Sequence, residues 1–269
     1  MKRYIPSFFL AVLILVLALS GCKSDKDTDN SWEEVQAKGE FVLGLDDSFP
    51  PMGYRDEHGE IVGFDIDVAK EVCSRLGINL RLQPINWSAK EQELSTKNID
   101  CIWNGLTITP ERREVILFTK PYMNNRQVLV VQADAGFTAP ADFAGKKLGI
   151  QAGSSANDAL NNAEEFKASL GEVVEFDDNM TALMDLEQGG LDVVLMDEIV
   201  ARFYIQQRSK SYKVLDEALA GEEYGVGFRK EDRELMEEFE ATLEAMAEDG
   251  TLAAISQSWF GEDITIINK

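Results

Sequence analysis

The chain has 269 residues, with 48 acidic and 26 basic side chains and a formal net charge of −22 at pH 7. This length exceeds the usual size of a single hydrophobic core, so we expect two lobes. The acidic excess excludes nucleic acid as a partner, because such a sequence offers no basic stripe to neutralise phosphates. The charge does not identify a ligand, since acidic surfaces commonly keep secreted proteins soluble.

The first 21 residues predict a signal peptide, because Lys2 and Arg3 precede an apolar segment over residues 8–19. Residues 19–22, Leu-Ser-Gly-Cys, resemble a bacterial lipobox. That resemblance implies cleavage before Cys22 and a lipid on its thiol, which anchors the protein to a bacterial membrane. The alternative is an ordinary signal peptide followed by a chance cysteine.

Residues 22–31 predict a flexible polar tether, and the folded part is expected to start near Trp32. Outside the signal peptide, the sequence lacks the roughly 18 consecutive apolar residues that a membrane span needs. We therefore expect the folded body to be extracytoplasmic.

Few residues of the mature sequence suit redox or metal chemistry. Apart from Cys22, the cysteines are Cys73 and Cys101, which either form one disulfide or act as small buried hydrophobic side chains. The one histidine, His58, lies in a turn-like segment. Catalytic triads and zinc sites built on histidine are therefore excluded, and we expect neither a metal nor a cofactor.

Short apolar strands alternate with amphipathic helices in the same order in two halves of the chain. In the first half we expect strands at 41–45, 78–82 and 99–103, with helices at 68–76 and 88–98. In the second half we expect strands at 147–150, 172–176 and 192–196, with helices at 155–168 and 179–188. This α/β pattern predicts two mostly parallel sheets with helices on both faces.

Polar residues and glycines follow the ends of the predicted strands, at Asp46, Asn104-Gly105, Gln151 to Ser155 and Asp197. In open parallel sheets, ligands bind beyond the carboxyl ends of the strands, where loops and helix N-termini converge. The sequence therefore predicts a binding cleft between the two lobes.

Arg112 is a candidate for holding a carboxylate. Thr109 and Pro110 predict the start of a helix, which places Arg112 near its positive end. A guanidinium group there suits two parallel hydrogen bonds to a carboxylate. The alternative is a surface arginine paired with Glu111 or Glu114.

Other candidates have equally simple structural alternatives. Ser154 and Ser155 offer hydroxyl and backbone N–H groups to an anion, or serve as a plain helix cap. Asp197 suits an ammonium group, or caps the next helix. Phe49 and Trp87 pack either on a ligand or in the core.

Asp46 and Asp47 form an acidic pair of a kind that performs acid–base chemistry in glycosidases or dehydratases. Without a histidine partner, a metal cluster or a nucleophile motif, catalysis has little support. We expect a binding protein rather than an enzyme.

Five segments resemble the family of bacterial solute-binding proteins for polar amino acids that serve ABC transporters. They are GFDIDVA at 63–69, NGLTITPER at 104–112, FTKPY at 118–122, DGTL at 249–252 and WFG at 259–261. The resemblance implies a two-lobed, type II periplasmic-binding-protein fold with crossovers near 123–126 and 219–223. Lobe 1 would combine residues 32–124 with 222–269, and lobe 2 would comprise residues 125–221.

The resemblance also implies roles for individual residues. It assigns the ligand's α-carboxylate to Arg112, Thr107, Ser154 and Ser155, and its α-ammonium to Asp197, Gly105 and Thr107. It assigns selectivity for the side chain to Asp46, Phe49, Trp87, Asn104 and Gln151.

The partners implied by the resemblance are a polar L-amino acid and the permease of an ABC importer, with the protein acting as a monomer. Many relatives have Ser where this chain has Asn104 and a larger polar residue where it has Ala156, so the ligand stays open among glutamine, arginine, lysine, histidine and cystine. The rival function is a secreted cyclohexadienyl or arogenate dehydratase on the same fold.

Overall fold

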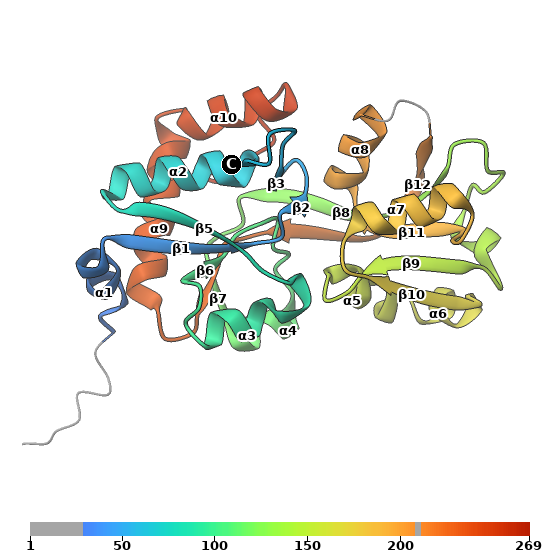
Figure 1. Ribbon diagram of the computed structural model, residues 1–269, viewed down its shortest axis with the longest axis horizontal. Coiled ribbons are helices and arrows are strands. Elements are labelled where there is room, and N and C mark those ends of the chain that lie inside the picture. Colours follow the sequence, from blue (N-terminus) through green and yellow to red (C-terminus); the bar gives the residue numbers. More distant parts are fainter. Residues whose placement is uncertain (1–28, 208–210) are drawn as a thin grey trace, which may run out of the picture.

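Two five-stranded sheets, each covered by helices on both faces, form two lobes that lie side by side (Figure 1). The computed structural model describes residues 29–207 and 211–269. The predicted signal peptide and Cys22 lie outside the described residues. Helix α1 begins at Ser31, inside the range predicted as tether, and Ser31 Oγ accepts the backbone N–H of Leu235 at 3.1 Å.

Lobe 1 is built on a sheet with strand order β5-β1-β6-β13-β7. The strands are β1 (Glu40–Leu45), β5 (Asn79–Pro84), β6 (Cys101–Ile102), β7 (Ile116–Phe118) and β13 (Gly227–Arg229). The helices are α1 (Ser31–Lys38), α2 (Phe64–Leu76), η1 (Trp87–Ala89), α3 (Lys90–Ser95), α4 (Pro110–Val115), α9 (Arg233–Glu248) and α10 (Thr251–Phe260). A small sheet of β2 (Ser48–Phe49), β3 (Gly53–Arg55) and β4 (Ile61–Val62) lies beside them.

Lobe 2 is built on a sheet with strand order β10-β9-β11-β8-β12. The strands are β8 (Met123–Gln132), β9 (Lys147–Gln151), β10 (Glu172–Phe176), β11 (Val193–Asp197) and β12 (Tyr212–Tyr224). The helices are η2 (Pro140–Phe143), α5 (Ser155–Asn162), α6 (Glu164–Ser169), α7 (Asn179–Gln188) and α8 (Glu198–Gln207). As in lobe 1, the central strands pair in parallel, β9 with both β10 and β11.

The chain passes between the lobes twice, from β7 into β8 and from β12 back into β13. Strands β8 and β12 pair antiparallel, with Met123 opposite Tyr224 at one end and Gln132 opposite Tyr212 at the other. In Figure 1 these two long strands run from one lobe into the other. The two-lobed fold with two crossovers confirms the predicted fold class.

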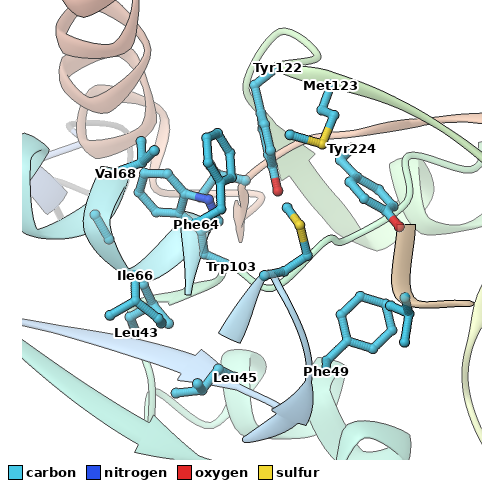
Figure 2. Close-up of a cluster of buried hydrophobic side chains, with 14 of the residues drawn as sticks. Leu43, Leu45, Phe49, Phe64, Ile66, Val68, Trp103, Tyr122, Met123 and Tyr224 are labelled. Atoms are coloured by element: carbon cyan, nitrogen blue, oxygen red, sulfur yellow. The ribbon is translucent and has the colours of Figure 1, made fainter. Parts of the chain in front are cut away.

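Successive side chains of β1 point to opposite faces of the sheet, so this strand contributes to the hydrophobic core on each face. Phe41, Leu43 and Leu45 join the core beneath α2 and α9, while Val42 joins the core beneath α3. Figure 2 shows part of the larger core, with Leu43 and Leu45 beneath Trp103. The carboxyl end of this buried strand leads directly to Asp46.

Several predicted boundaries differ from the structure for local reasons. The helix predicted from Ser88 to residue 98 is a turn of 3₁₀-helix followed by α3, since Asn86 Oδ1 accepts both the backbone N–H and the hydroxyl of Ser88. The helix predicted over 155–168 breaks at Ala163, which has ψ of 59° and separates α5 from α6. By contrast, α7 has the predicted bounds and ends at Gly189 in the left-handed conformation.

The disulfide considered between Cys73 and Cys101 is not formed. Both cysteines are free and buried, in α2 and β6, within the same hydrophobic core. Their thiols act as small apolar side chains, and burial raises the pKa of Cys73 to about 12. Over residues 29–207 and 211–269, no helix is long and apolar enough to cross a membrane.

Candidate functional site

All eleven residues predicted to bind a ligand are buried, and they gather where the two lobes face each other. Seven belong to lobe 1: Asp46, Phe49, Trp87, Asn104, Gly105, Thr107 and Arg112. Four belong to lobe 2: Gln151, Ser154, Ser155 and Asp197. Hydrogen bonds cross between the sets, from Gln151 Nε2 to Asp46 Oδ2 at 2.6 Å and from Ser155 Oγ to Thr107 Oγ1 at 3.1 Å. The fold therefore brings the predicted residues together.

Arg112 lies in the first turn of α4, where Thr109 Oγ1 accepts its backbone N–H at 3.2 Å, as the predicted N-cap requires. Arg112 as a whole is 8% exposed, and its guanidinium group donates to the carbonyls of Thr107, at 2.9 Å, and Gly153, at 3.1 Å. The alternative of a surface arginine paired with Glu111 or Glu114 is wrong. Its Nε lies 4.0 Å from Glu91 Oε1. Because a guanidinium group has five N–H donors and two of them are bound to backbone carbonyls, it can make further hydrogen bonds to a ligand carboxylate.

A second cation, Lys90, lies beside Arg112 and was not predicted. Its side chain is 2% exposed, and Nζ donates to the Gly153 carbonyl at 2.7 Å and lies 3.1 Å from Glu91 Oε1. It also lies 5.1 Å from the ring centroid of Trp87, so Trp87 packs against a cation. Burial, with a smaller effect of Arg112, lowers the pKa of Lys90 to about 8. A lone lysine in a short polar helix gave no sequence signal for this position.

The start of α5 brings lobe 2 close to these cations. Ser154 Oγ donates to the Gln151 carbonyl at 2.8 Å and does not cap the helix, which removes the plain-cap alternative for its side chain. Ser155, the first residue of α5, donates its hydroxyl to Thr107 instead. The positive end of a helix therefore adjoins a buried arginine and a buried lysine, a setting that favours a carboxylate.

Asp197 ends β11 and is fully enclosed on the opposite lobe from Arg112. Its Oδ1 accepts hydrogen bonds from Asn125 Nδ2 at 2.5 Å and from the Tyr224 hydroxyl at 2.7 Å. Burial, and next the negative charge of Glu222, raise the pKa of Asp197 to about 7. A cationic partner in place of the proton stabilises the ionised form of such a buried carboxylate.

Three polar residues of the crossing strands form hydrogen bonds with the predicted site but were not predicted from the sequence. They are Asn125 and Gln127 on β8, and Glu222 on β12. Glu222 Oε2 accepts hydrogen bonds from Thr107 Oγ1 at 3.1 Å, and from Asn125 Nδ2 and Gln127 Nε2 at 3.0 Å each. We call Thr107, Asn125, Gln127, Ser155 and Glu222 the interlobe network. The sequence marks only one of the three missed residues, Gln127, which directly precedes the apolar run at 128–131.

Asp46 lies at the carboxyl end of β1, buried against lobe 2. Its Oδ1 accepts the backbone N–H of Ser48 at 2.9 Å, and its own N–H donates to Asn104 Oδ1 at 3.0 Å. Burial raises the pKa of Asp46 to about 6, and the hydrogen bond from Gln151 opposes that shift. Gln151 is itself oriented by Asn179, which donates to Gln151 Oε1 at 3.1 Å.

Gly105 has a φ of 59°, and a Cβ there would lie 2.8 Å from the ring of Phe49 and 3.2 Å from the ring of Tyr224. Figure 2 places both rings on the same side of the buried cluster, away from Phe64. The N–H of Gly105 donates to Asp65 Oδ2 at 2.7 Å. This amide N–H therefore supports the loop and is not open to a ligand, and the ring of Phe49 packs close to Gly105.

A surface cleft of about 710 Å³ opens next to this site, between the β2–β3 hairpin and helices α7 and α8. It is lined by Asp47, Tyr54, Asp178 and Phe203, among others, and by none of the eleven predicted residues. The predicted residues already contact each other across the lobes, so the site between them is closed. Across the described part of the chain, no His, Cys, Asp and Glu side chains group in threes to hold a metal ion.

The site presents a buried arginine on one lobe and a buried aspartate on the other, which is complementary to a small molecule carrying both charges. With the fold, this defines a two-lobed solute-binding protein of the type II periplasmic class. The sequence profile described as bacterial extracellular solute-binding proteins, family 3, matches residues 41–262. The chain belongs to this family.

Known relatives and solved structures are similar over most of the chain. The L-cystine-binding protein TcyJ of Escherichia coli (strain K12) is 30% identical over 234 residues, covering 86% of each chain. A substrate-binding protein of an ABC uptake transporter from Streptococcus pneumoniae, with bound histidine, is 39% identical, has a TM-score of 0.85 and covers 88% of this chain and 98% of that one. The structure of Tv2483 bound to L-arginine is 33% identical, has a TM-score of 0.86 and covers 90% and 98%.

Proposed function

We propose that this protein captures a polar L-amino acid between its lobes and delivers it to the permease of an ABC importer. The observation that carries the proposal is the placement of Arg112 and Asp197, two buried side chains of opposite charge on opposite lobes. We call this pair the zwitterion clamp. Arg112 takes the α-carboxylate, with Ser154, Ser155 and Thr107, and Asp197 takes the α-ammonium.

The clamp couples binding to closure of the lobes. A ligand shifts the equilibrium between open and closed forms only when it binds one form more tightly than the other. An amino acid that contacts Arg112 and Asp197 together does so only when the lobes are closed. Strands β8 and β12 are the hinge in this proposal, with lobe 1 formed by residues 32–124 and 222–269 and lobe 2 by 125–221.

Asp46 favours a ligand whose side chain donates hydrogen bonds, since a buried carboxylate needs a donor or an opposite charge. Phe49 and Trp87 supply apolar walls, and Asn104 and Gln151 hold Asp46 in place. Relatives named for cystine, arginine and histidine support this choice. The candidate ligands are glutamine, arginine, lysine, histidine and cystine.

The proposal places the protein outside the cytoplasm as a monomer, anchored by a lipid on Cys22. The lipobox-like residues 19–22 and the polar segment after them support the anchor. The family description, extracellular solute-binding, supports the compartment.

A thermal-shift panel with the five candidate amino acids tests the function. A ligand that binds only the folded protein raises its melting temperature in a saturable way. We expect at least one of the five to do so while remaining chemically intact. If none stabilises the protein and prephenate or arogenate is converted instead, the dehydratase is the correct function and the binding proposal is wrong.

A further inference from the structure

A second carboxylate lies beside Asp197 where strand β12 passes between the lobes. The amide nitrogen of Asn125 donates to Asp197 Oδ1 at 2.5 Å and to Glu222 Oε2 at 3.0 Å, so one nitrogen joins both carboxylates. Thr107, assigned above to the ligand, donates its hydroxyl to the same Glu222 oxygen at 3.1 Å. Glu222 therefore contacts the site from the hinge side.

Two buried acceptors in the same cluster have no donor. The side-chain oxygens Asn125 Oδ1 and Gln127 Oε1 make no hydrogen bond, although Gln127 is fully buried and Asn125 is 7% exposed. The amide nitrogens of both residues are directed to Glu222 and its neighbours. A buried acceptor without a donor costs about 1–3 kcal/mol, so the cluster has an excess of acceptors that a cationic donor would satisfy.

We propose that Glu222 acts with Asp197 as a second carboxylate for the ligand's α-ammonium group. The inference rests on the proposed function and extends the ammonium end of the clamp to the hinge strands. An ammonium group carries three N–H donors and one positive charge, which suits a position between the carboxylates of Asp197 and Glu222. A ligand without that amine leaves the same cluster unsatisfied.

The charge balance at this end supports the assignment. Two neighbouring carboxylates disfavour double ionisation, and the presence of Glu222 contributes to the raised pKa of Asp197. The polar groups that act on Asp197 are Glu222, the Tyr224 hydroxyl, the amides of Asn125 and Gln127 and, on the other lobe, Arg112. Binding of an ammonium group then displaces a proton, so affinity rises as the pH increases through about 7.

The test compares Glu222→Gln with Glu223→Gln, its exposed neighbour on β12, by titration calorimetry. The probes are the tightest-binding amino acid among glutamine, arginine, lysine, histidine and cystine, and the acid with the same side chain but no α-amino group. We expect Glu222→Gln to weaken binding of the amino acid by about tenfold or more, which is less than the roughly 30-fold minimum for a fully buried charged pair because Glu222 is half-buried. The same substitution should weaken binding of the deaminated acid by less than threefold. Glu223→Gln should leave the affinity for both probes unchanged.

A second readout tests whether the charge of Glu222 acts on Asp197 at the ammonium end of the site. Removing the charge of Glu222 lowers the pKa of Asp197, so the pH midpoint of amino acid affinity should move to lower pH in Glu222→Gln. Equal losses for both probes, or an unchanged midpoint in a folded variant, would overturn the assignment and leave the proposed function standing. If the parent protein binds none of the five amino acids, the proposed function fails and this inference fails with it.

Discussion

Gly153 offers the clearest perturbation of lobe closure, because it approaches the other lobe without contributing a side chain. A Cβ on Gly153 would lie 2.8 Å from Ser88 Cα and 3.3 Å from Ser88 Cβ, and its carbonyl accepts hydrogen bonds from Lys90 and Arg112. The clash with Ser88 exists only when the lobes are closed. Gly153→Ala should therefore weaken binding while leaving both side chains of the zwitterion clamp in place.

The magnitude follows from two separable effects. Gly153 has a φ of +71°, so alanine is strained by about 1–2 kcal/mol in both the open and closed forms, which lowers stability but not affinity. The contact with Ser88 is an overpacked one, which typically costs about 1–3 kcal/mol, or roughly fivefold to 150-fold in Kd. Only this second effect is measured by a binding titration.

Gly145→Ala is the matched control, because Gly145 has nearly the same φ, +70°, and no atom within 4 Å of its Cβ position. Both variants should lose thermal stability by similar amounts, while only Gly153→Ala loses affinity in titration calorimetry. If the two variants bind the tightest amino acid equally well, the closed arrangement of the lobes is not the one that holds the ligand.

Three further predictions follow from the site and the N-terminus. Asp46→Ala should weaken the best ligand more than a small apolar amino acid in the same titration, and equal loss across the panel would assign Asp46 to structure alone. Cys22→Ser should release the protein from the membrane fraction, and a variant that stays there as firmly as the parent would contradict the lipid anchor. The pKa values of Asp46, Asp65 and Asp197 are raised by burial to between about 6 and 7, so the folded, ligand-free protein binds more protons than the unfolded chain between about pH 4 and 7. Its free energy of unfolding should therefore fall as the pH rises through that window, and urea denaturation showing greater stability at pH 8 than at pH 5 would contradict this.

The helices, the strands and the polar residues at strand ends could be predicted, because local apolar periodicity marks them in the sequence. Asp46 and Asp197 were found because each ends an apolar strand, and α7 because its apolar spacing stops at a glycine. The break at Ala163 was missed because alanine is a strong helix former and gave no stop signal.

The interlobe network was missed for a different reason. Glu222 and Asn125 lie far apart in the sequence and meet only because β8 and β12 pair in antiparallel register. That register is set by the tertiary structure, so neither residue has a local pattern that marks it as part of a site. Lys90 likewise bonds to lobe 2, through the Gly153 carbonyl, a contact that exists only in the folded chain.

In the proposed clamp, Arg112 and Asp197 bind the two charges of one ligand from opposite lobes. Titration calorimetry with Arg112→Ala and Asp197→Ala measures it most directly, with Arg113→Ala, an exposed neighbour, as the control. Removing one member of a buried charged pair costs about 2–5 kcal/mol, so each variant should bind roughly 30-fold to several thousand-fold more weakly while remaining folded. Folded variants that bind within about threefold of the parent protein would contradict the zwitterion clamp.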